Sequence, residues 1–502
     1  MNARTFLVFL AMLGCAAGAG AQQRSTSPAP AAETSATPVV TRHGVQVHGQ
    51  RLDYSATVGT MPVKLATGAQ ADMSYVAYTS HPGQNRPITF LFNGGPGSAS
   101  LWLDLGSFGP RRLETRSPQP TPAAPFHIVD NAETLLDTTD LVFIDAVGTG
   151  ISRVREGTDA NAFSGVDPDL ESFADFIATY LTQNDRWASP KFILGESYGA
   201  TRAAALAHVL QRRGASPNGV ILLSSILNFS SYHPGIDRGF LNTLPTMAAT
   251  AWYHHRAGRD APDLPTFVQQ ARDFAGGDYA DALQLGDRLP AEREAAIRAK
   301  LAAFTGLSPD DLRRTGLRID VGQFAKLLLG GGRAVGIYDT RASAEDTDAA
   351  AQSPSFDPAD TVVANVFPAA NLAYLTQELG YRSTEPYRAT VPGLPNRWDW
   401  SHAAPGMSDR LTSPAMEFDL SAAMHEDPTL RVLSLNGYYD LGTPFFGTEY
   451  DLAHMRLGPA IRPNLTFRHY PAGHMLYLDG AVRAATARDI RAWIATTLEA
   501  RP

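Results

Sequence analysis

The feature that most constrains this chain is the short stretch ILGESYGA, Ile193 to Ala200. It fits the pattern G-x-S-x-G, with Ser197 between Gly195 and Gly199. The apolar run KFILG leads into it and the helix-forming run ATRAAALAHVL follows it, so the sequence predicts a strand, a sharp turn and a helix. Small glycines leave room for that turn, and the serine hydroxyl then lies exposed above the sheet near a helix N-terminus. The motif indicates a nucleophilic serine, and a surface turn that merely contains serine is the alternative.

Strands and helices alternate on both sides of this motif. Apolar stretches at Pro87–Phe92, Leu141–Asp145 and 219–227 predict further strands. An amphipathic helix follows the second of them, and we expect Asp167 to cap its N-terminus with Pro168 at the first helical position. Near-continuous apolar strands between amphipathic helices indicate a mostly parallel, doubly wound sheet covered on both faces. The predicted fold class is therefore α/β.

The alternation is interrupted once. From residue 231 to residue 426 the sequence is mixed and mainly helical, with loops rich in Asp, Pro and Gly. Strands return with RVLSLNG and NLTFRHY, and a last helix closes the pattern. A chain of 502 residues is long enough for one large domain with an insertion. We expect a catalytic domain made of residues 41–230 and 427–502, and an inserted cap made of residues 231–426.

The first residues have the composition of an export signal. Residues 1–21 carry a positive charge, a short apolar run and a small-residue cleavage site, which predicts a signal peptide and an exported, periplasmic or secreted protein. Residues 22–40 are rich in Ser, Thr, Pro and Ala and are expected to form a flexible linker. MLGC loosely resembles a bacterial lipobox, so a lipid anchor on Cys15 is the alternative. The apolar run is too short to span a bilayer.

A nucleophilic serine needs a base, and the base needs an orienting carboxylate. In this architecture they follow in the order Ser, Asp, His, each on a loop after a later strand. Asp440 follows the strand in VLSLNGYYDLGTP, and His474 follows the strand in FRHYPAGHM. The order of the chain therefore predicts Ser197, Asp440 and His474 as a catalytic triad, although a lone loop histidine or aspartate is usually surface.

An acyl-transfer enzyme also needs hydrogen-bond donors for the developing oxyanion. FLFNGGPGSAS gives a strand followed by Asn93, two glycines, Pro96 and Gly97. Glycines there allow backbone N–H groups to approach a ligand closely. The segment is expected to form an oxyanion loop, and a simple β-turn is the alternative.

Together the segments NGGPGSAS, LVFIDAVGTGIS, GESYG, NGYYDLGTPFFGTEY and AGHM resemble the serine carboxypeptidase family. The resemblance runs from Pro87 to Leu227 and from Arg431 to the C-terminus, and it is poor across the insertion. It implies an α/β-hydrolase fold with a cap-like insertion, nucleophile Ser197, orienter Asp440 and base His474. It also implies that the backbone N–H groups of Gly95 and Tyr198 form the oxyanion hole.

The same resemblance suggests a role for the acid before the serine. In the family, the residues matching Asn93, Gly94 and Glu196 bind the free C-terminal carboxylate of a peptide. Two carboxyl groups can share a hydrogen bond only if one is protonated, so Glu196 is expected to have a raised pKa and peptides to bind best in acid. An ion pair between Glu196 and Arg202 is the alternative.

Two departures from the family pattern bear on this role. The family often has a second Glu in an E-x-G-P pattern, whereas here Ser107 occupies that place. Asp104, three residues earlier, would present its acid on a similar face if the segment were helical. The Cys and Trp common in the family around NGGPG are Ser98 and Leu91 here.

The sequence thus predicts an exported serine carboxypeptidase that releases C-terminal amino acids from peptides through an acyl-enzyme on Ser197, favoured at acidic pH. We expect no metal, no organic cofactor and no membrane span. The net charge of −8, without dense Lys or Arg runs, argues against a nucleic-acid partner. An esterase or acyltransferase with the same triad is the nearest alternative, and a noncatalytic binding protein is a second. The oligomeric state is left open.

Overall fold

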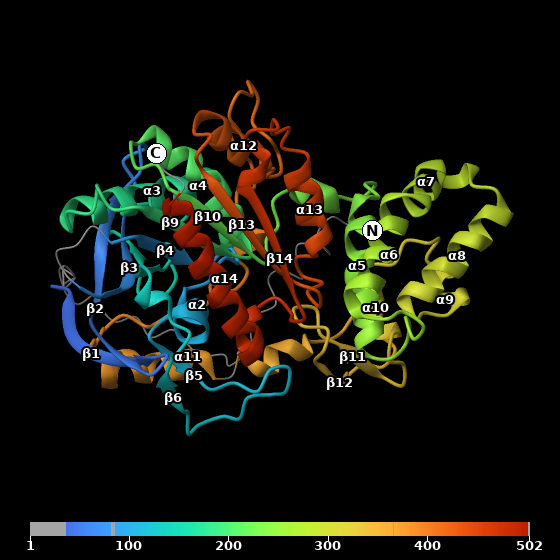
Figure 1. The fold of residues 1–502 in the computed structure, drawn as a ribbon, viewed down its shortest axis with the longest axis horizontal. Coiled ribbons are helices and arrows are strands. Elements are labelled where there is room, and N and C mark those ends of the chain that lie inside the picture. Colours follow the sequence, from blue (N-terminus) through green and yellow to red (C-terminus); the bar gives the residue numbers. More distant parts are fainter. Residues whose placement is uncertain (1–36, 82–85, 365, 500–502) are drawn as a thin grey trace, which may run out of the picture.

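The computed structural model describes residues 37–81, 86–364 and 366–499. Its centre is a ten-stranded sheet in which the antiparallel strands β1, β2 and β3 lead into six parallel strands from β7 to β14 (Figure 1). In sheet order the strands are β1 (Val39–Val47), β2 (Gln50–Lys64), β3 (Gln70–Thr79), β7 (Asp140–Ile144), β4 (Ile88–Phe92), β9 (Lys191–Glu196), β10 (Gly219–Leu223), β13 (Arg431–Gly437) and β14 (Leu465–Tyr470), with β8 (Arg153–Val154) paired to β3. This is the predicted mostly parallel α/β sheet.

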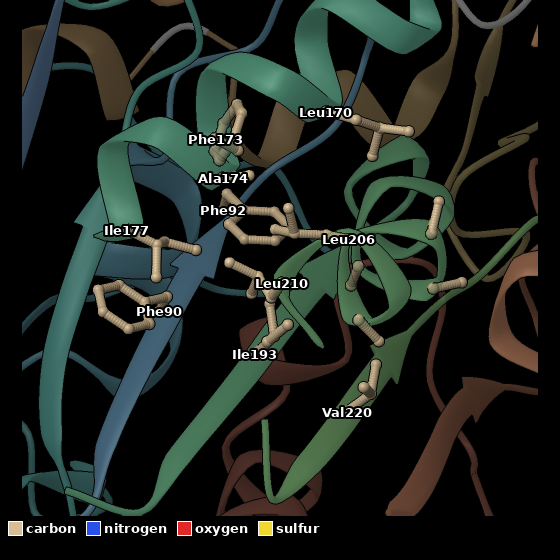
Figure 2. Packing of buried hydrophobic residues seen from close by; sticks show 14 of the residues in the cluster. Phe90, Phe92, Leu170, Phe173, Ala174, Ile177, Ile193, Leu206, Leu210 and Val220 are labelled. Atoms are coloured by element: carbon tan, nitrogen blue, oxygen red, sulfur yellow. The ribbon is translucent and has the colours of Figure 1, made fainter. Parts of the chain in front are cut away.

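Helices cover both faces of the sheet. On one face lie α3 (Val166–Gln183), α4 (Tyr198–Arg212) and α12 (Glu417–Glu426), and on the other lie α2 (Leu101–Leu103), α11 (Phe367–Ala373) and α14 (Gly480–Glu499). Side chains of a strand alternate between the two faces. Thus Phe90 and Phe92 pack on the α3 side, where Figure 2 shows them with Phe173 and Ile177, whereas Leu91 joins the other core. Burial on both sides explains the unbroken apolar sequence of these strands.

The start of α3 differs from the prediction. Its N-cap is Gly165, and no side chain caps it. Asp167 lies in the first turn, and its carboxylate contacts the ring of His402 and the backbone N–H of Ala403 instead. The carboxylate of Asp167 therefore binds a segment that is distant in the sequence instead of capping its own helix.

A helical lobe with its own apolar core lies at the end of the molecule opposite β1 and β2 (Figure 1). Its core includes Leu244, Phe274, Leu301 and Phe324. The helices of the lobe are α5 (Arg238–Tyr253), α6 (Leu264–Gly276), α7 (Asp278–Leu285), α8 (Ala291–Thr305), α9 (Pro309–Arg314) and α10 (Val321–Leu327). The short strands β11 (Arg333–Val335) and β12 (Ser343–Glu345) pair after them.

The end of the predicted insertion, 231–426, packs on the sheet. Leu420 and Met424 of α12 join the core that α3 and α4 form on the sheet, and Phe367 joins the opposite core. The segment 367–426 thus packs on the α/β domain rather than with the lobe. Helical periodicity marks a buried face but not the partner that buries it, so the sequence alone placed the boundary at 426. At the other end, Val39 and Val40 belong to β1, so the predicted linker is two residues too long.

Two further strands, β5 (Arg111–Leu113) and β6 (Ile128–Asp130), pair with each other. Helix α13 (Phe445–Ala453) lies between the sheet and the helical lobe and packs against α5 (Figure 1). The predicted signal peptide (1–21), Cys15 and linker residues 22–36 lie outside the described residues. Within the described residues, no helix is both long and apolar enough to cross a bilayer.

Candidate active site

Ser197 lies on the turn between β9 and α4 and has an unusual backbone conformation. Its φ is 61° and its ψ is −129°, and its N–H donates to the carbonyl of Leu223 at 3.0 Å. A non-glycine residue at positive φ costs about 1–3 kcal/mol, which the surrounding structure must offset. The two flanking glycines are required sterically. A Cβ on Gly195 would lie 1.9 Å from the carbonyl oxygen of Gly199, and one on Gly199 would lie 2.5 Å from that of Phe92.

Asp440 and His474 come together from loops after β13 and β14. The Nδ1 of His474 lies 2.7 Å from Oδ2 of Asp440. The other oxygen of Asp440 accepts the backbone N–H groups of Gly442 and Thr443, both at 2.9 Å. The Thr443 hydroxyl donates to Oδ2 at 2.6 Å. These bonds fix the carboxylate, which in turn fixes the imidazole with Nε2 available for a reacting group.

The backbone and ring of His474 are held from two further directions. Its N–H donates to the carbonyl of Tyr338 at 2.6 Å, and the Ser224 hydroxyl donates to its carbonyl at 2.6 Å. The ring of Tyr338 covers the imidazole, with centroids 4.7 Å apart. Burial lowers the pKa of His474, but the carboxylates of Asp440, Glu196 and Asp357 outweigh it and leave the pKa above its usual range.

The glycine loop after β4 lies against the N-terminus of α4. A Cβ on Gly94 would lie 2.4 Å from the backbone nitrogen of Tyr198 and 2.5 Å from that of Gly199. Gly95 has a φ of 108°, which only glycine adopts readily. The loop residues 93–98, Ser197 and His474 line one cavity. The backbone N–H groups at this end of α4 also carry the positive end of the helix dipole.

Glu196 is 1% exposed and helps to line this cavity. Its Oε2 accepts hydrogen bonds from Nδ2 of Asn93 at 2.8 Å and from the hydroxyl of Tyr477 at 2.7 Å. Burial raises the pKa of Glu196 to about 7, although His474 and the two hydrogen bonds oppose the shift. A buried carboxyl with this pKa carries a proton in mildly acidic solution, as the resemblance implied.

The alternative partner for Glu196 is excluded by the structure. Arg202 is buried and pairs with Asp169, with nitrogen–oxygen distances of 2.7 and 3.2 Å. Its remaining Nη donates to the carbonyl of Asn93 at 3.0 Å. Arg202 therefore supports the glycine loop after β4, and among the described residues no Lys or Arg forms an ion pair with Glu196.

The expectation for Asp104 is wrong. The segment from Asp104 to Phe108 forms one π-helical turn, η1, and Asp104 points to β3, where its Oδ2 accepts from the hydroxyl of Tyr78 at 3.0 Å. Ser107 donates to the carbonyl of Leu103 at 2.5 Å. Among the described residues that line the cavity, neither Asp104 nor Ser107 is present. In a π-turn, successive side chains are rotated by a different angle than in an α-helix, so the face expected for Asp104 does not apply.

Sequence reasoning missed several residues around the cavity. Tyr477 follows AGHM closely and could have been noticed as a buried tyrosine near the base. Thr443 follows Asp440 by three residues, a spacing at which a turn can bring a hydroxyl group back to the carboxylate. Tyr338, Asp339 and Asp360 also line the cavity, but they come from the insertion, where no motif marks them. In the described part of the chain, no group of three or more His, Cys, Asp or Glu side chains is arranged to hold a metal ion.

Comparisons with known proteins find similarity in part of the sequence and in the fold. Residues 51–243 match the family model of the serine carboxypeptidases. Among solved structures, the chain is similar to Kex1, a prohormone-processing carboxypeptidase from Saccharomyces cerevisiae, with a TM-score of 0.53 and 14% identity over 88% of this chain and 92% of that chain. A proline iminopeptidase from Mycobacterium smegmatis matches with a TM-score of 0.35 and 14% identity over 87% and 99% of the two chains. No curated protein sequence matches the chain.

The family match covers the glycine loop after β4 and Ser197, whereas Asp440 and His474 lie beyond it. The structural likeness to Kex1 extends over most of both chains and supports the same fold. The chain thus has an α/β-hydrolase fold, and its residues 51–243 are similar to the serine carboxypeptidases.

Proposed function

We propose that the protein is a serine carboxypeptidase that removes C-terminal amino acids from peptides through an acyl-enzyme on Ser197. The observation that carries the proposal is the position of Glu196. A buried carboxyl with a raised pKa lies beside the candidate nucleophile and is held by Asn93 and Tyr477. Such a group can donate a proton to a peptide's terminal carboxylate, which an ordinary ionised Glu would repel.

In the proposed first half-reaction, the hydroxyl of Ser197 attacks the carbonyl carbon of the last peptide bond. His474 takes the hydroxyl proton at Nε2 while Asp440 stabilises the imidazolium that forms. The backbone N–H groups of Gly95 and Tyr198 stabilise the oxyanion. His474 then gives its proton to the leaving nitrogen, and the C-terminal amino acid departs.

In the second half-reaction, a water molecule attacks the acyl-enzyme. His474 takes a proton from that water and later returns it to Ser197, so the enzyme is regenerated and the shortened peptide leaves as a carboxylic acid. Asn93, Gly94 and Glu196 have no part in these proton transfers. Their proposed task is to hold the terminal carboxylate, which sets the scissile bond in register with Ser197.

Two opposing pH effects follow from the proposal. Carboxylate binding requires Glu196 to be protonated, so binding weakens as the pH rises through about 7. The base must be neutral, and the raised pKa of His474 weakens catalysis at lower pH. Activity is therefore expected to peak in mildly acidic solution, between these two limits.

We also propose that residues 1–21 direct export to the periplasm or the medium, with lipidation at Cys15 as the alternative. The catalytic domain is proposed to comprise the sheet with its covering helices, and the cap to be the lobe from α5 to α10. Peptides with a free C-terminal carboxylate are the proposed substrates.

The test is hydrolysis of an N-blocked dipeptide beside its C-terminal amide from pH 4 to 8, with Ser197→Ala as the blank. Cleavage of the free acid, with much slower cleavage of the amide, is the expected result. Equal turnover of both would remove the carboxylate-binding role, whereas turnover of simple esters alone would identify an esterase or acyltransferase that uses the same serine. If Ser197→Ala retained full activity, the assignment of the nucleophile would be wrong.

A further inference from the structure

The motif LVFIDAVGTGIS, residues 141–152, carries part of the resemblance to the serine carboxypeptidases, but the proposed mechanism uses none of its side chains. No described residue of the motif lines the cavity above Ser197. The motif begins in β7, and Asp145 follows directly at the carboxyl end of that strand. Its Oδ1 accepts the backbone N–H of Ser100 and its Oδ2 accepts the hydroxyl of Ser74, each at 2.8 Å. The carboxylate therefore joins the motif to the segment after the glycine loop.

Other residues of the motif fit around this carboxylate. The hydroxyl of Ser152 donates to the backbone carbonyl of Asp145 at 3.0 Å and accepts the backbone N–H of Ser74 at 2.7 Å. A glycine is required at Gly150, because a Cβ there would lie 2.0 Å from Oδ2 of Asp145. The motif thus holds the Asp145 carboxylate in one position.

Ser100 connects Asp145 to the start of the glycine loop. Its hydroxyl donates to the carbonyl of Ile144 at 2.5 Å, so two hydrogen bonds fix Ser100 against the end of β7. The same hydroxyl accepts the backbone N–H of Asn93 at 3.3 Å. Ser100 is also the N-cap residue of α2, and the backbone N–H of Leu103 in that helix donates to Oδ1 of Asn93 at 3.1 Å. Ser100 therefore positions the backbone of Asn93 directly and its side chain through α2.

Two proposed parts of the site depend on the position of Asn93. It immediately precedes Gly94 and Gly95, and the backbone N–H of Gly95 is a proposed oxyanion donor. Its Nδ2 donates to Oε2 of Glu196 at 2.8 Å. A shift of Asn93 would therefore move an oxyanion donor and the carboxylate-binding pair together. Misplacement by about 1 Å can lower the rate of an enzyme about 100-fold.

We propose that Asp145 is a positioning residue for the reaction: its carboxylate fixes Ser100, and through Ser100 it holds the glycine loop in the geometry that the oxyanion requires. This inference rests on the proposed function. It assigns a task to the motif of residues 141–152, which belongs neither to the triad nor to the proposed carboxylate site. Because the acceptor is charged, the hydrogen bonds from Ser100 and Ser74 are strongest while Asp145 is ionised.

The charge of Asp145 changes in the pH range in which the enzyme is expected to work. Burial raises the pKa of Asp145 to about 6, although the hydrogen bonds from Ser100 and Ser74 oppose the shift. Among the described residues, the titratable groups whose charge interacts with it are Asp104 on η1 and Tyr387. Burial raises the pKa of Asp104 to about 8 and that of Tyr387 above its usual range. Of these three groups, Asp145 is therefore the one that changes charge near pH 6.

The experiment compares Asp145→Asn and Asp145→Ala with the unaltered enzyme on an N-blocked dipeptide and on a p-nitrophenyl ester that has no terminal carboxylate. Asp145→Ala should lower kcat about 100-fold on both substrates, since both need the oxyanion donors. It should raise KM about tenfold for the dipeptide alone, because that substrate also needs Asn93. Asp145→Asn keeps an oxygen that can accept from Ser100, so at pH 8 it should lower kcat only about 3- to 10-fold.

The pH profile separates positioning from a purely structural role. Below about pH 6 the carboxyl group of Asp145 becomes neutral and resembles Asn, so the ratio of kcat between the unaltered enzyme and Asp145→Asn should fall toward one. The base cancels from this ratio, because the carboxylates that raise the pKa of His474 are Asp440, Glu196 and Asp357. A ratio that stays constant between pH 5 and 8, with KM for the dipeptide unchanged in Asp145→Ala, would indicate lost stability alone and overturn the inference.

Asp140→Asn is the matched control. Asp140 is the first residue of β7, is 2% exposed and pairs with Arg186 at 2.6 Å, so its loss should destabilise the fold without changing kcat. Ser100→Ala tests the connection, because it removes the hydrogen bond to Asn93. Combined with Asp145→Ala, it should lower kcat little further than the more damaging single variant does. Fully additive losses would mean that Asp145 acts by another route, and the inference would fail.

The two substrates also separate this inference from the proposed function. If the dipeptide were cleaved and Asp145→Ala kept the kcat of the unaltered enzyme, the proposed function would stand and this inference would fail. If the ester alone were cleaved, the carboxypeptidase function would fail, and kcat for the ester would still decide the role of Asp145. If neither substrate were cleaved, both proposals would fail.

Discussion

The hydroxyl of Tyr477 donates a 2.7 Å hydrogen bond to Oε2 of Glu196, across 281 positions of the sequence. Asn93 donates to the same oxygen at 2.8 Å. Both donors thus hold one side of the carboxyl group, and burial raises its pKa to about 7. The arrangement orients a carboxyl group that can still carry a proton on its other oxygen.

Replacing Glu196 with Gln should leave a group that resembles the protonated acid at every pH. The amide oxygen can accept from Asn93 and Tyr477, and the NH₂ group can donate to a substrate carboxylate. KM for an N-blocked dipeptide should therefore stop rising as the pH increases through about 7, whereas in the unaltered enzyme it should rise. The measurement is KM and kcat between pH 5 and 9.

The same variant removes one of the negative charges that raise the pKa of His474. The decline of kcat/KM in acid should consequently shift to lower pH. Glu196→Ala serves as the comparison and should raise KM at all pH values. A KM profile for Glu196→Gln that still rises near pH 7 would show that another group controls carboxylate binding.

Thr443→Val should lower kcat by about tenfold, because it removes a hydroxyl that donates to Asp440 Oδ2 at 2.6 Å. With one donor fewer, Asp440 attracts the imidazolium of His474 more strongly. The acid limb of the kcat/KM profile should then move to higher pH. Thr443→Ser keeps the hydroxyl and should restore both values, and a loss shared by both variants would point to packing instead.

Gly94→Ala should lower kcat by at least about 100-fold, the scale of losing an oxyanion donor. The new methyl group would lie 2.4 Å from the backbone nitrogen of Tyr198 and so displace the loop. Gly276→Ala, at a position where a Cβ meets nothing within 4 Å, is the control. Circular dichroism of both variants should match the parent protein, and a fully active Gly94→Ala would remove the loop from the mechanism.

Asp169→Asn should destabilise the protein by about 3–5 kcal/mol, because it leaves a buried guanidinium without its counter-charge. The Arg202 side chain is 0% exposed and its Nε lies 2.7 Å from Asp169. Urea unfolding gives the difference. The control is Asp53→Asn, since the pair between Arg51 and Asp53 is exposed and should contribute about 0–1 kcal/mol. Similar losses for both variants would contradict this explanation.

His402 should make the stability depend on pH. Burial lowers the pKa of His402, but hydrogen bonds to Asp167 at 2.6 Å and Asp419 at 2.9 Å outweigh it and raise the pKa to about 9. The raised pKa stabilises the fold by about 3 kcal/mol below pH 6.5, and this contribution disappears as the pH rises through about 9. His402→Asn should therefore cost much more at pH 6 than at pH 10 in urea unfolding. A loss that does not change with pH would show that packing, rather than charge, dominates.

The parts of the fold that could be predicted are those that local sequence specifies. The strand before Ser197 and those before Asp440 and His474 are continuous apolar runs, and a parallel sheet places their ends along one edge. Asp440 and His474 were thereby expected near each other, and they lie 2.7 Å apart. The catalytic roles of these residues remain predictions.

The parts that could not be predicted depend on contacts between distant segments. Tyr338 and Asp360 come from a region without a motif, and only the folded chain brings them to the cavity. Asp104 was misplaced because one π-turn, which no sequence signal marks, rotates its side chain toward β3. Asp167 was misassigned as a cap because its partner, His402, lies 235 positions away.

The contact of Tyr338 with His474 has a consequence for engineering. The backbone N–H of His474 donates to the carbonyl of Tyr338, and the two rings are 4.7 Å apart. The segment that follows the helical lobe, which contains Tyr338, therefore helps to position the imidazole. A chimaera that exchanged the lobe together with this segment would also alter the surroundings of the histidine. If the downstream crossover point lay between α10 and β11, the lobe would be exchanged while Tyr338 kept its contacts with His474. New cap sequences could then be tried without rebuilding the site.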